Sequence, residues 1–507
     1  MARGAAGEAA RDGAMTLAVG ILTDLLIGLF VLAQFRFALL ILAVRRVRAA
    51  PVPPSADLPM VAIQVATYRE ARILPSLLKS IHALEWPLDR LVVQILDDSS
   101  GADAEATQAA IAGNSKPGLA IEYLNRGHRS GYKAGALNHG IAAARGVDFI
   151  AYFDADCRPR PQFLLRTTGA LAQPDVAAVQ ARWEFPNALA SPLTALQAAA
   201  FEYLFRYEYE TRSQLGLPAY YLGSAAVWKR QVIEDLGGWK EEPLTAEDVD
   251  IGYRAAAAGW RIVWEPDALA DDDALEDLLA FRAQQRRWTR AVLQASFDAV
   301  PGVRGRKRTP WASLMEWTTI VPHSTILLTL LLGLAMSIGR AGTDRRSHYA
   351  EWLLTGLFIA PPAVIALILA VRGYHPGDWR RRVKLLALAG PYAAATMTSF
   401  LFGIWDFLSR RKVEFVATPK AGQVAVLKGS PKSWLKAQLP PLAFDWASSA
   451  LLVAATVSSC LSGDWSRVVP TFILALAYGP NAVLTAWNVR ARWAAMSRAA
   501  APSEPGS

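Results

Sequence analysis

Long apolar segments bracket one stretch of ordinary soluble composition in this 507-residue chain. The first runs from Met15 to Val44, and the others follow residue 307. A helix needs about 20 apolar residues to cross the hydrocarbon core of a bilayer. The chain also exceeds the usual size of one compact domain, and 53% of its residues are apolar, which is high for a soluble protein. We therefore predict a multi-pass membrane protein with its soluble domain at residues 51–300.

The remaining segments follow from composition. Residues 1–14 are rich in Ala and Gly and are predicted to be disordered, as is the polar tail 491–507. A first transmembrane helix is predicted at 15–48, and a transmembrane and interfacial region at 311–490. The candidate spans in that region are Trp311–Ile338, Glu351–Val371, Leu385–Leu408, Leu442–Leu461 and Val468–Trp487. Because Leu385–Leu408 has basic residues at both ends and contains Pro391 and Asp406, we predict that it lies along the membrane interface or re-enters.

The net charge of +9 fits two kinds of partner, nucleic acid or membrane. The basic runs at 45–48, 380–384 and 410–412 stand beside apolar segments, which is the positive-inside pattern. We therefore expect a lipid bilayer and no nucleic acid as a partner, with residues 51–300 on the cytoplasmic side. The two cysteines, Cys157 and Cys460, are far apart, so no disulfide framework is indicated.

Short β-branched runs alternate with helical stretches in the soluble domain. This alternation is typical of an α/β fold with a mainly parallel sheet. The predicted strands are Met60–Ala66, Leu91–Leu96, Leu119–Tyr123 and Phe149–Phe153, and the predicted helices are Ile73–Ala83, Ala104–Ala112 and Lys133–Ala144.

Acidic residues follow two of these strands. Asp97 and Asp98 end the second strand, and Asp154-Ala155-Asp156 ends the fourth. Ligands bind beyond the carboxyl ends of strands in such sheets. Asp154 and Asp156 offer hard oxygen ligands for Mg²⁺ or Mn²⁺, which could neutralise a diphosphate leaving group. An Asp-x-Asp turn on its own is more often a helix cap, so its neighbours decide its meaning.

Three further groups could serve the same chemistry. Asp248, with Glu247 beside it, opens a helical run; it could be a general base or could simply favour a helix N-terminus. Lys133 stands between glycines and could pair with phosphate, or the segment could be an ordinary turn. Gln284, Arg287 and Trp288 could hold a diphosphate and stack on a sugar, or could belong to a basic helix on a membrane surface.

The order of these motifs resembles the family-2 processive glycosyltransferases, which include cellulose synthases and mannan synthases. Two further segments add to the resemblance. Val179–Phe185 (VQARWEF) looks like the version found in mannan and glucan-backbone synthases, and Phe415–Lys420 (FVATPK) looks like the gating loop of the cellulose synthases, here near 413–422.

The resemblance implies a GT-A, Rossmann-like catalytic domain that uses Mg²⁺ or Mn²⁺. It implies that Asp248 is the base, with Glu247 beside it, and that Asp156 and Asp154 face the metal. The substrate-binding residues that it implies are Thr67, Tyr68, Glu70, Asp97, Asp98, Lys133, Asp154, Gln284, Arg287, Trp288, Thr418 and Lys420. Arg69, Ala246 and the segment 222–225 depart from the family pattern, so we expect the base contacts and the acceptor specificity to differ from those of the family.

The activity implied is an inverting transfer from a nucleotide-sugar donor, UDP-glucose or GDP-mannose, to a glycan acceptor. The product would be a β-linked polysaccharide that the protein exports. One alternative is a non-processive transferase that makes a glycolipid, similar to ceramide glucosyltransferase. A second is a transporter or receptor with a degenerate transferase domain, which would be expected to lack some of the carboxylates, and all are present. Neither a protein partner nor an oligomeric state is indicated.

Overall fold

The computed structural model describes residues 58–214, 221–241, 246–303, 376–410, 431–463 and 465–499. The predicted helix at 15–48, both predicted spans at 311–338 and 351–371, and the predicted gating loop near 413–422 with Thr418 and Lys420 lie outside these residues. The strands are β1 (Val61–Thr67), β2 (Leu91–Asp97), β3 (Ala120–Asn125), β4 (Phe149–Asp154), β5 (Arg158–Pro159), β6 (Val176–Glu184), β7 (Ala226–Lys229) and β8 (Arg261–Asp271).

Helices alternate with these strands and then continue alone after β8. The α-helices are α2 (Leu74–His82), α3 (Ala102–Ala112), α4 (Tyr132–Ala143), α5 (Phe163–Leu171), α6 (Pro192–Tyr203), α7 (Glu210–Gln214), α8 (Arg230–Asp235), α9 (Glu247–Ala258), α10 (Leu278–Val303), α14 (Trp379–Ala387), α15 (Gly390–Leu408), α16 (Pro431–Leu461) and α17 (Trp465–Ala499). Short 3-10 turns form η1 (Leu88–Arg90) and η3 (Pro376–Asp378), and η2 (Leu204–Tyr209) is a π-helical turn.

The strands form one mixed sheet in the order β3-β2-β1-β4-β7-β6-β8-β5. Strands β3, β2, β1 and β4 are parallel, which confirms the mainly parallel arrangement predicted for this half; β7 then runs antiparallel to β4. The register pairs Thr67 with Asp97 and Ala66 with Asp154. The carboxyl ends of these strands therefore meet at one edge, which brings the two acidic segments together.

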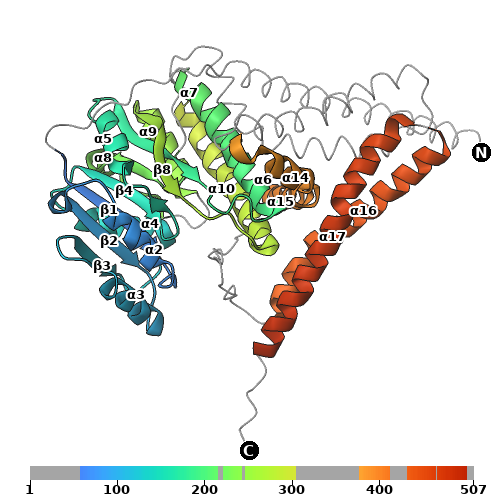
Figure 1. The fold of residues 1–507 in the computed structure, drawn as a ribbon, viewed down its shortest axis with the longest axis horizontal. Coiled ribbons are helices and arrows are strands. Elements are labelled where there is room, and N and C mark those ends of the chain that lie inside the picture. Colours follow the sequence, from blue (N-terminus) through green and yellow to red (C-terminus); the bar gives the residue numbers. More distant parts are fainter. Residues whose placement is uncertain are drawn as a thin grey trace, which may run out of the picture.

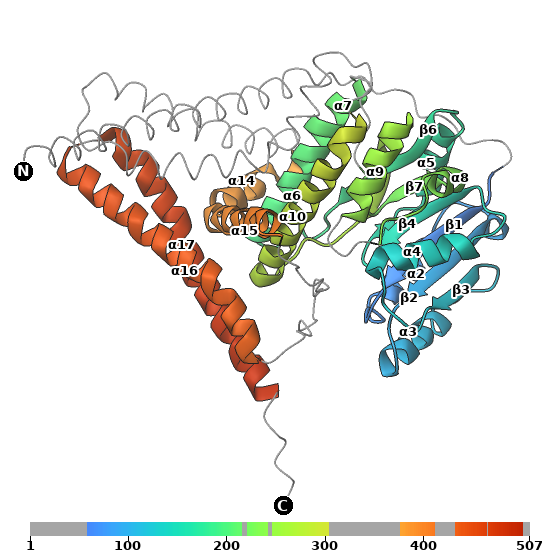
Figure 2. The same cartoon turned by 180° about the vertical axis from the view of Figure 1, so that it is seen from behind.

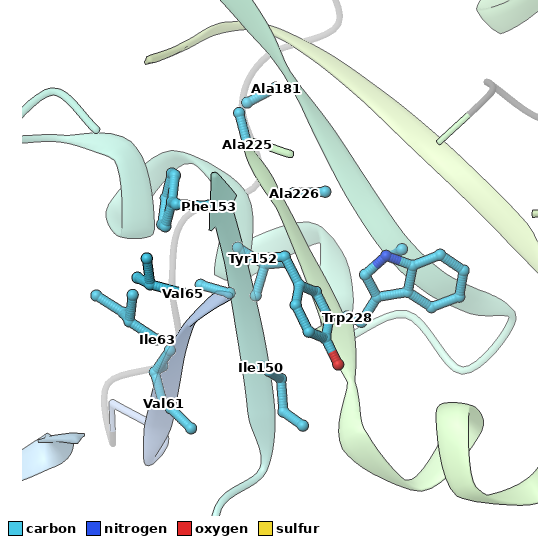
Figure 3. Packing of buried hydrophobic residues seen from close by; sticks show 14 of the residues in the cluster. Val61, Ile63, Val65, Ile150, Tyr152, Phe153, Ala181, Ala225, Ala226 and Trp228 are labelled. Atoms are coloured by element: carbon cyan, nitrogen blue, oxygen red, sulfur yellow. The ribbon is translucent and has the colours of Figure 1, made fainter. Parts of the chain in front are cut away.

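The core of the domain lies on both faces of this sheet. Ile150 and Tyr152 of β4 point to the side of Trp228, while Val61, Ile63 and Val65 of β1 point to the other side with Phe153 (Figure 3). All of these side chains are at most 2% exposed. Helices pack on each face, for example α2, which buries the side chains at positions 74, 77, 78 and 81. Strands buried on both faces explain the nearly continuous apolar runs in the sequence.

The helices after β8 extend away from the sheet. Helices α16 and α17 run side by side as a long hairpin, and α14 and α15 lie between this hairpin and α10 (Figures 1 and 2). Within the described residues, Pro431–Leu461 and Thr471–Arg498 are long and apolar enough to cross a bilayer. A third span would arise if α14 and α15, which meet at a bend of 59°, crossed as one.

Two boundaries differ from the prediction. The segment predicted at Leu385–Leu408 is divided by the bend, because Pro391 in the first turn of α15 has no N–H to donate to the carbonyl of Ala387, the last residue of α14. Helix α17 continues to Ala499, whereas the disordered tail was predicted to begin at residue 491. The added turns contain alanines, which favour a helix, and Arg492 contacts Asp277 of the soluble domain.

Candidate active site

A lysine and carboxylates from three separate elements meet at the carboxyl edge of the sheet. Lys133, from the first turn of α4, places its Nζ 2.6 Å from Asp154 Oδ1 and 4.0 Å from Glu247 Oε1. It also donates to the Gly223 carbonyl at 2.8 Å. Burial alone would lower the pKa of Lys133, but the charges of Asp154 and Glu247 outweigh it and raise that pKa. The lysine is therefore a fixed cation that can face a diphosphate.

The glycines around Lys133 allow the close approach predicted from the sequence. Gly131 precedes α4 with a φ of +69°, in the left-handed region that favours glycine. A Cβ at Gly135 would overlap the Ser130 carbonyl oxygen. The segment is thus both a tight turn and the support of the lysine, so the two interpretations of this motif hold together.

Asp248 lies in the first turn of α9, where the Val249 N–H donates to its Oδ1 at 2.8 Å. Burial, with a further contribution from the neighbouring charge of Glu247, raises the pKa of Asp248 to about 7, against the opposing charge of Lys133. A carboxyl group with this pKa can accept a proton near neutral pH, as a general base must. Asp248 therefore fits both interpretations from the sequence: it stands at a helix N-terminus, and it is a candidate general base.

The turn Asp154-Ala155-Asp156 follows β4 at the same edge. Its backbone is closed by a bond from the Cys157 N–H to the Asp154 carbonyl, at 2.9 Å, and Ala155 is buried beneath it. Within the described residues, no group of three or more His, Cys, Asp or Glu side chains is arranged to hold a metal ion. Mg²⁺ and similar ions are often held by one or two carboxylates together with substrate phosphates. Asp156 and Asp154 fit that mode of binding.

The residues predicted to bind the base lie at the ends of β1 and β2. The two aspartates among them accept hydrogen bonds from other groups of the protein. Asp97 is fully buried and accepts from the Ser99 N–H at 2.9 Å and the Tyr123 hydroxyl at 3.0 Å. Asp98 accepts two bonds from Arg126, at 2.9 and 2.6 Å. The pair between Asp98 and Arg126 is also almost fully buried, so both aspartates are fixed by contacts within the protein.

The first loop follows β1 directly. Thr67 is buried at the strand end, and the Tyr68 ring lies 3.7 Å from the Arg129 guanidinium in a cation–π contact. The Glu70 carbonyl accepts from the Ile73 N–H at 3.0 Å and so closes the turn into α2. The loop therefore presents an aromatic face close to the strand ends.

Helix α10 carries the predicted Gln284, Arg287 and Trp288. Burial lowers the pKa of Arg287, and the charges of Glu247, Asp154 and Asp248 oppose this effect, which places the guanidinium in the field of the carboxylate cluster. The Trp288 ring meets Phe201 edge to face, with 6.2 Å between centroids. The structure thus brings Arg287 near the carboxylates from about 130 residues beyond Asp154 in the sequence, while Trp288 packs on Phe201 of α6.

Comparison with known proteins agrees with this geometry. Residues 149–371 match the family model described as "Glycosyl transferase family group 2". This chain carries a family-2 glycosyltransferase domain. The match starts at β4 and thus includes the Asp-x-Asp turn, Asp248 and α10.

Curated plant proteins that are similar to this chain point to a narrower group of glycosyltransferases. Over 238 residues the chain is 40% identical to "Probable glucomannan 4-beta-mannosyltransferase 6" of Oryza sativa subsp. japonica, an alignment that covers 46% of this chain and 41% of that protein. It is 37% identical over 235 residues to "Glucomannan 4-beta-mannosyltransferase 1" of Cyamopsis tetragonoloba, covering 46% and 44%. The chain thus spans less than half the length of these relatives. The resemblance to the cellulose-synthase-like enzymes predicted from the motifs is confirmed.

A solved structure supports the fold. The mannosyltransferase PcManGT from Pyrobaculum calidifontis, in complex with GDP-Man and Mn²⁺, superposes with a TM-score of 0.54 at 21% identity. The superposition covers 78% of this chain and 99% of that one. The GT-A-like fold predicted for the glycosyltransferase domain is therefore confirmed.

Several residues of the site were not assigned a role from the sequence. Gly223 has a φ of +80°, and a Cβ there would stand 2.8 Å from Asp248 Oδ2. The Ser224 hydroxyl accepts from the Asp154 N–H at 2.9 Å. Arg126 binds Asp98, and Asn138 of α4 donates to the Trp239 carbonyl at 2.9 Å. Gly223 and Ser224 lie in the segment 222–225, whose departure from the family pattern was the one sequence feature that could have drawn attention to them.

Proposed function

We propose that the protein is an inverting membrane glycosyltransferase that extends a β-linked polysaccharide from a nucleotide-sugar. One observation carries the proposal. Asp248, with a pKa raised to about 7, stands with Lys133, Asp154 and Glu247 at the carboxyl edge of a GT-A sheet. This arrangement joins a base active at neutral pH to a cation and carboxylates that suit a metal-bound diphosphate.

The reaction follows from the charges of the site. Asp248 takes the proton of the acceptor hydroxyl, and that oxygen attacks the anomeric carbon of the donor. The bond from this carbon to the diphosphate breaks on the opposite face, so an α-linked donor gives a β-linked product. Lys133 and Arg287 face the departing negative charge. Mg²⁺ or Mn²⁺ held by Asp156 and Asp154 would neutralise part of the same charge.

The choice of donor rests on the relatives. The aligned proteins are named as glucomannan 4-beta-mannosyltransferases. We therefore propose GDP-mannose as the first donor and UDP-glucose as the second. This proposal includes a glycan acceptor and a polymer product. The alternative is a ceramide-like lipid acceptor, which would give a glycolipid product.

The test is an assay of the full chain in lipid vesicles with each donor in parallel. Radiolabelled GDP-mannose or UDP-glucose is supplied with Mn²⁺ and either a short β-manno-oligosaccharide or ceramide. We expect label in a product that β-mannanase digests and that linkage analysis shows to be β-linked, and no such label with Asp248→Asn. Label only in lipid would favour the glycolipid alternative. No transfer from either donor to either acceptor would overturn the proposal.

We also propose that the glycosyltransferase domain is cytoplasmic and that the product crosses the membrane beside α16 and α17. The two long apolar helices and the basic runs support this orientation. Single cysteines introduced at Gly377 and Gly422 should both be protected from an impermeant maleimide in intact cells. Labelling of either one alone would contradict this topology.

A further inference from the structure

Helix α10 has two faces with different partners. At 100° per residue, Gln284, Arg287 and Trp288 share the face toward the carboxylate cluster, as the charges acting on Arg287 confirm. Arg282 and Arg286 lie on the opposite face. Helix α15 lies against α10 (Figures 1 and 2), and its Asp406 contacts Arg286 on that opposite face. Helix α15, from the predicted membrane region, therefore packs against the side of α10 that is opposite the candidate donor-binding and acceptor-binding side chains.

The contact between α15 and α10 is unusually close at Gly403. A Cβ added there would stand 2.7 Å from the Arg286 carbonyl oxygen and 2.8 Å from Thr289 Cβ. Real Cβ atoms essentially never approach backbone atoms this closely, so only glycine fits. The backbone of α15 thus sets the position of α10 directly, at the turn before Arg287 and Trp288.

An ion pair fixes the same turn. Asp406 has no exposed surface and accepts from Arg286 Nε at 2.5 Å and Nη2 at 2.8 Å. This bidentate geometry fixes rotation as well as distance. One turn earlier in α10, Arg282 donates to Asp445 of α16 at 2.7 Å, and this carboxylate is also fully buried. Helix α10 is therefore held from behind by charged contacts to two helices of the membrane region.

We propose that Gly403, Asp406 and Arg286 are positioning residues that hold Arg287 and Trp288 at the active site. This inference rests on the proposed function, because it concerns the same transfer reaction. Moving α10 would take Arg287 away from the diphosphate, but Lys133 and the carboxylates, which belong to the sheet side, would still hold the donor. Moving α10 should therefore lower the rate of transfer more than the affinity for the nucleotide.

The decisive comparison uses two glycines of one helix. In Gly403→Ala the new Cβ must push α15 and α10 apart. In the control Gly390→Ala the nearest atom is Ala477 Cβ at 3.8 Å, an ordinary contact. For purified full-length protein in vesicles we expect kcat to fall about tenfold or more in Gly403→Ala, because a displacement near 1 Å can cost about a hundredfold. We expect the Kd for GDP with Mn²⁺, measured by calorimetry, to rise by a smaller factor than kcat falls, because Lys133 and the carboxylates still hold the diphosphate. We expect Gly390→Ala to match the wild type.

A second set of variants covers the case in which Gly403→Ala does not fold. Arg286→Lys keeps the charge but cannot make the bidentate pair, so it should lower kcat with little change in GDP affinity. The combination of Arg286→Asp with Asp406→Arg should recover more transfer than either single change. Wild-type kcat in both Gly403→Ala and Arg286→Lys, or equal losses of GDP affinity and kcat, would overturn the inference. Absence of transfer in the wild type would instead refute the proposed function.

Discussion

The raised pKa of Asp248 makes a prediction about the acid limb of the pH profile. Its pKa of about 7 stands well above the usual 3.8, first because of burial and next because of the charge on Glu247. A general base works only when it is deprotonated, so kcat/KM should fall as the pH drops through about 7. The variant Glu247→Gln removes the neighbouring negative charge. The pKa of Asp248 should then fall, and the acid limb should move to lower pH.

The size of the effect follows from the same values. The total rise of about three units corresponds to about 4 kcal/mol between the two protonation states. Because burial is the largest cause, loss of the Glu247 charge should reverse only part of this rise, and we expect the pKa of Asp248 to fall by about one pH unit. At pH 6 a group with a pKa of 7 is roughly a tenth ionised, and a group with a pKa of 6 is about half ionised. Relative to its own plateau, the variant should therefore be about fivefold more active at pH 6.

The measurement is kcat/KM for sugar transfer between about pH 5 and 9 at saturating Mn²⁺, because this quantity reports the free enzyme. The control is Glu234→Gln, whose carboxylate pairs with Arg230 on α8, away from the site. Its profile should match the wild type. An acid limb that stays in place in Glu247→Gln, or that moves to higher pH, would refute the assignment of this limb to Asp248.

Four further predictions concern single residues of the site. Asp248→Asn should lower transfer by about a hundredfold or more while GDP binding stays intact, and near-normal turnover would remove Asp248 from the mechanism. Activity should disappear with EDTA and return with Mg²⁺ or Mn²⁺, and Asp156→Ala should weaken nucleotide binding as well as turnover, both measurable by calorimetry and transfer assays. Trp288→Ala should shorten the product more than it weakens donor binding, and unchanged product length would assign the indole to packing on Phe201. Gly223→Ala should lower activity about tenfold or more, because its Cβ would displace the Asp248 carboxylate and its φ of +80° disfavours alanine; wild-type kinetics would show that the turn can relax.

The alternation of strands and helices could be predicted because each signal is local. The buried runs at 61–67, 91–97 and 149–154 are strands, as the β-branched residues there predicted. The end of α17 could not be placed, because the residues after 490 are stabilised in part by the contact of Arg492 with Asp277, which is remote in sequence. The predicted gating residues Thr418 and Lys420 stay a prediction.

The sequence by itself determined which chemical groups the protein has and in which order. The order of Lys133, Asp154, Asp248 and the Gln-x-x-Arg-Trp segment was enough to indicate a glycosyltransferase, because that order resembles the family-2 processive enzymes. No local pattern, however, could show that Gly223 fits against Asp248. That contact depends on where two loops end after the sheet has formed.

The tertiary structure alone decided how the helices that follow α10 in the chain relate to the site. Arg286 and Asp406 are 120 residues apart in the chain, and nothing near either residue indicates the other. Gly403 looked like one more small residue in an apolar helix until its distance to α10 was known. Close packing between distant segments depends on the summed shape of many side chains, and neither propensity nor periodicity carries that information.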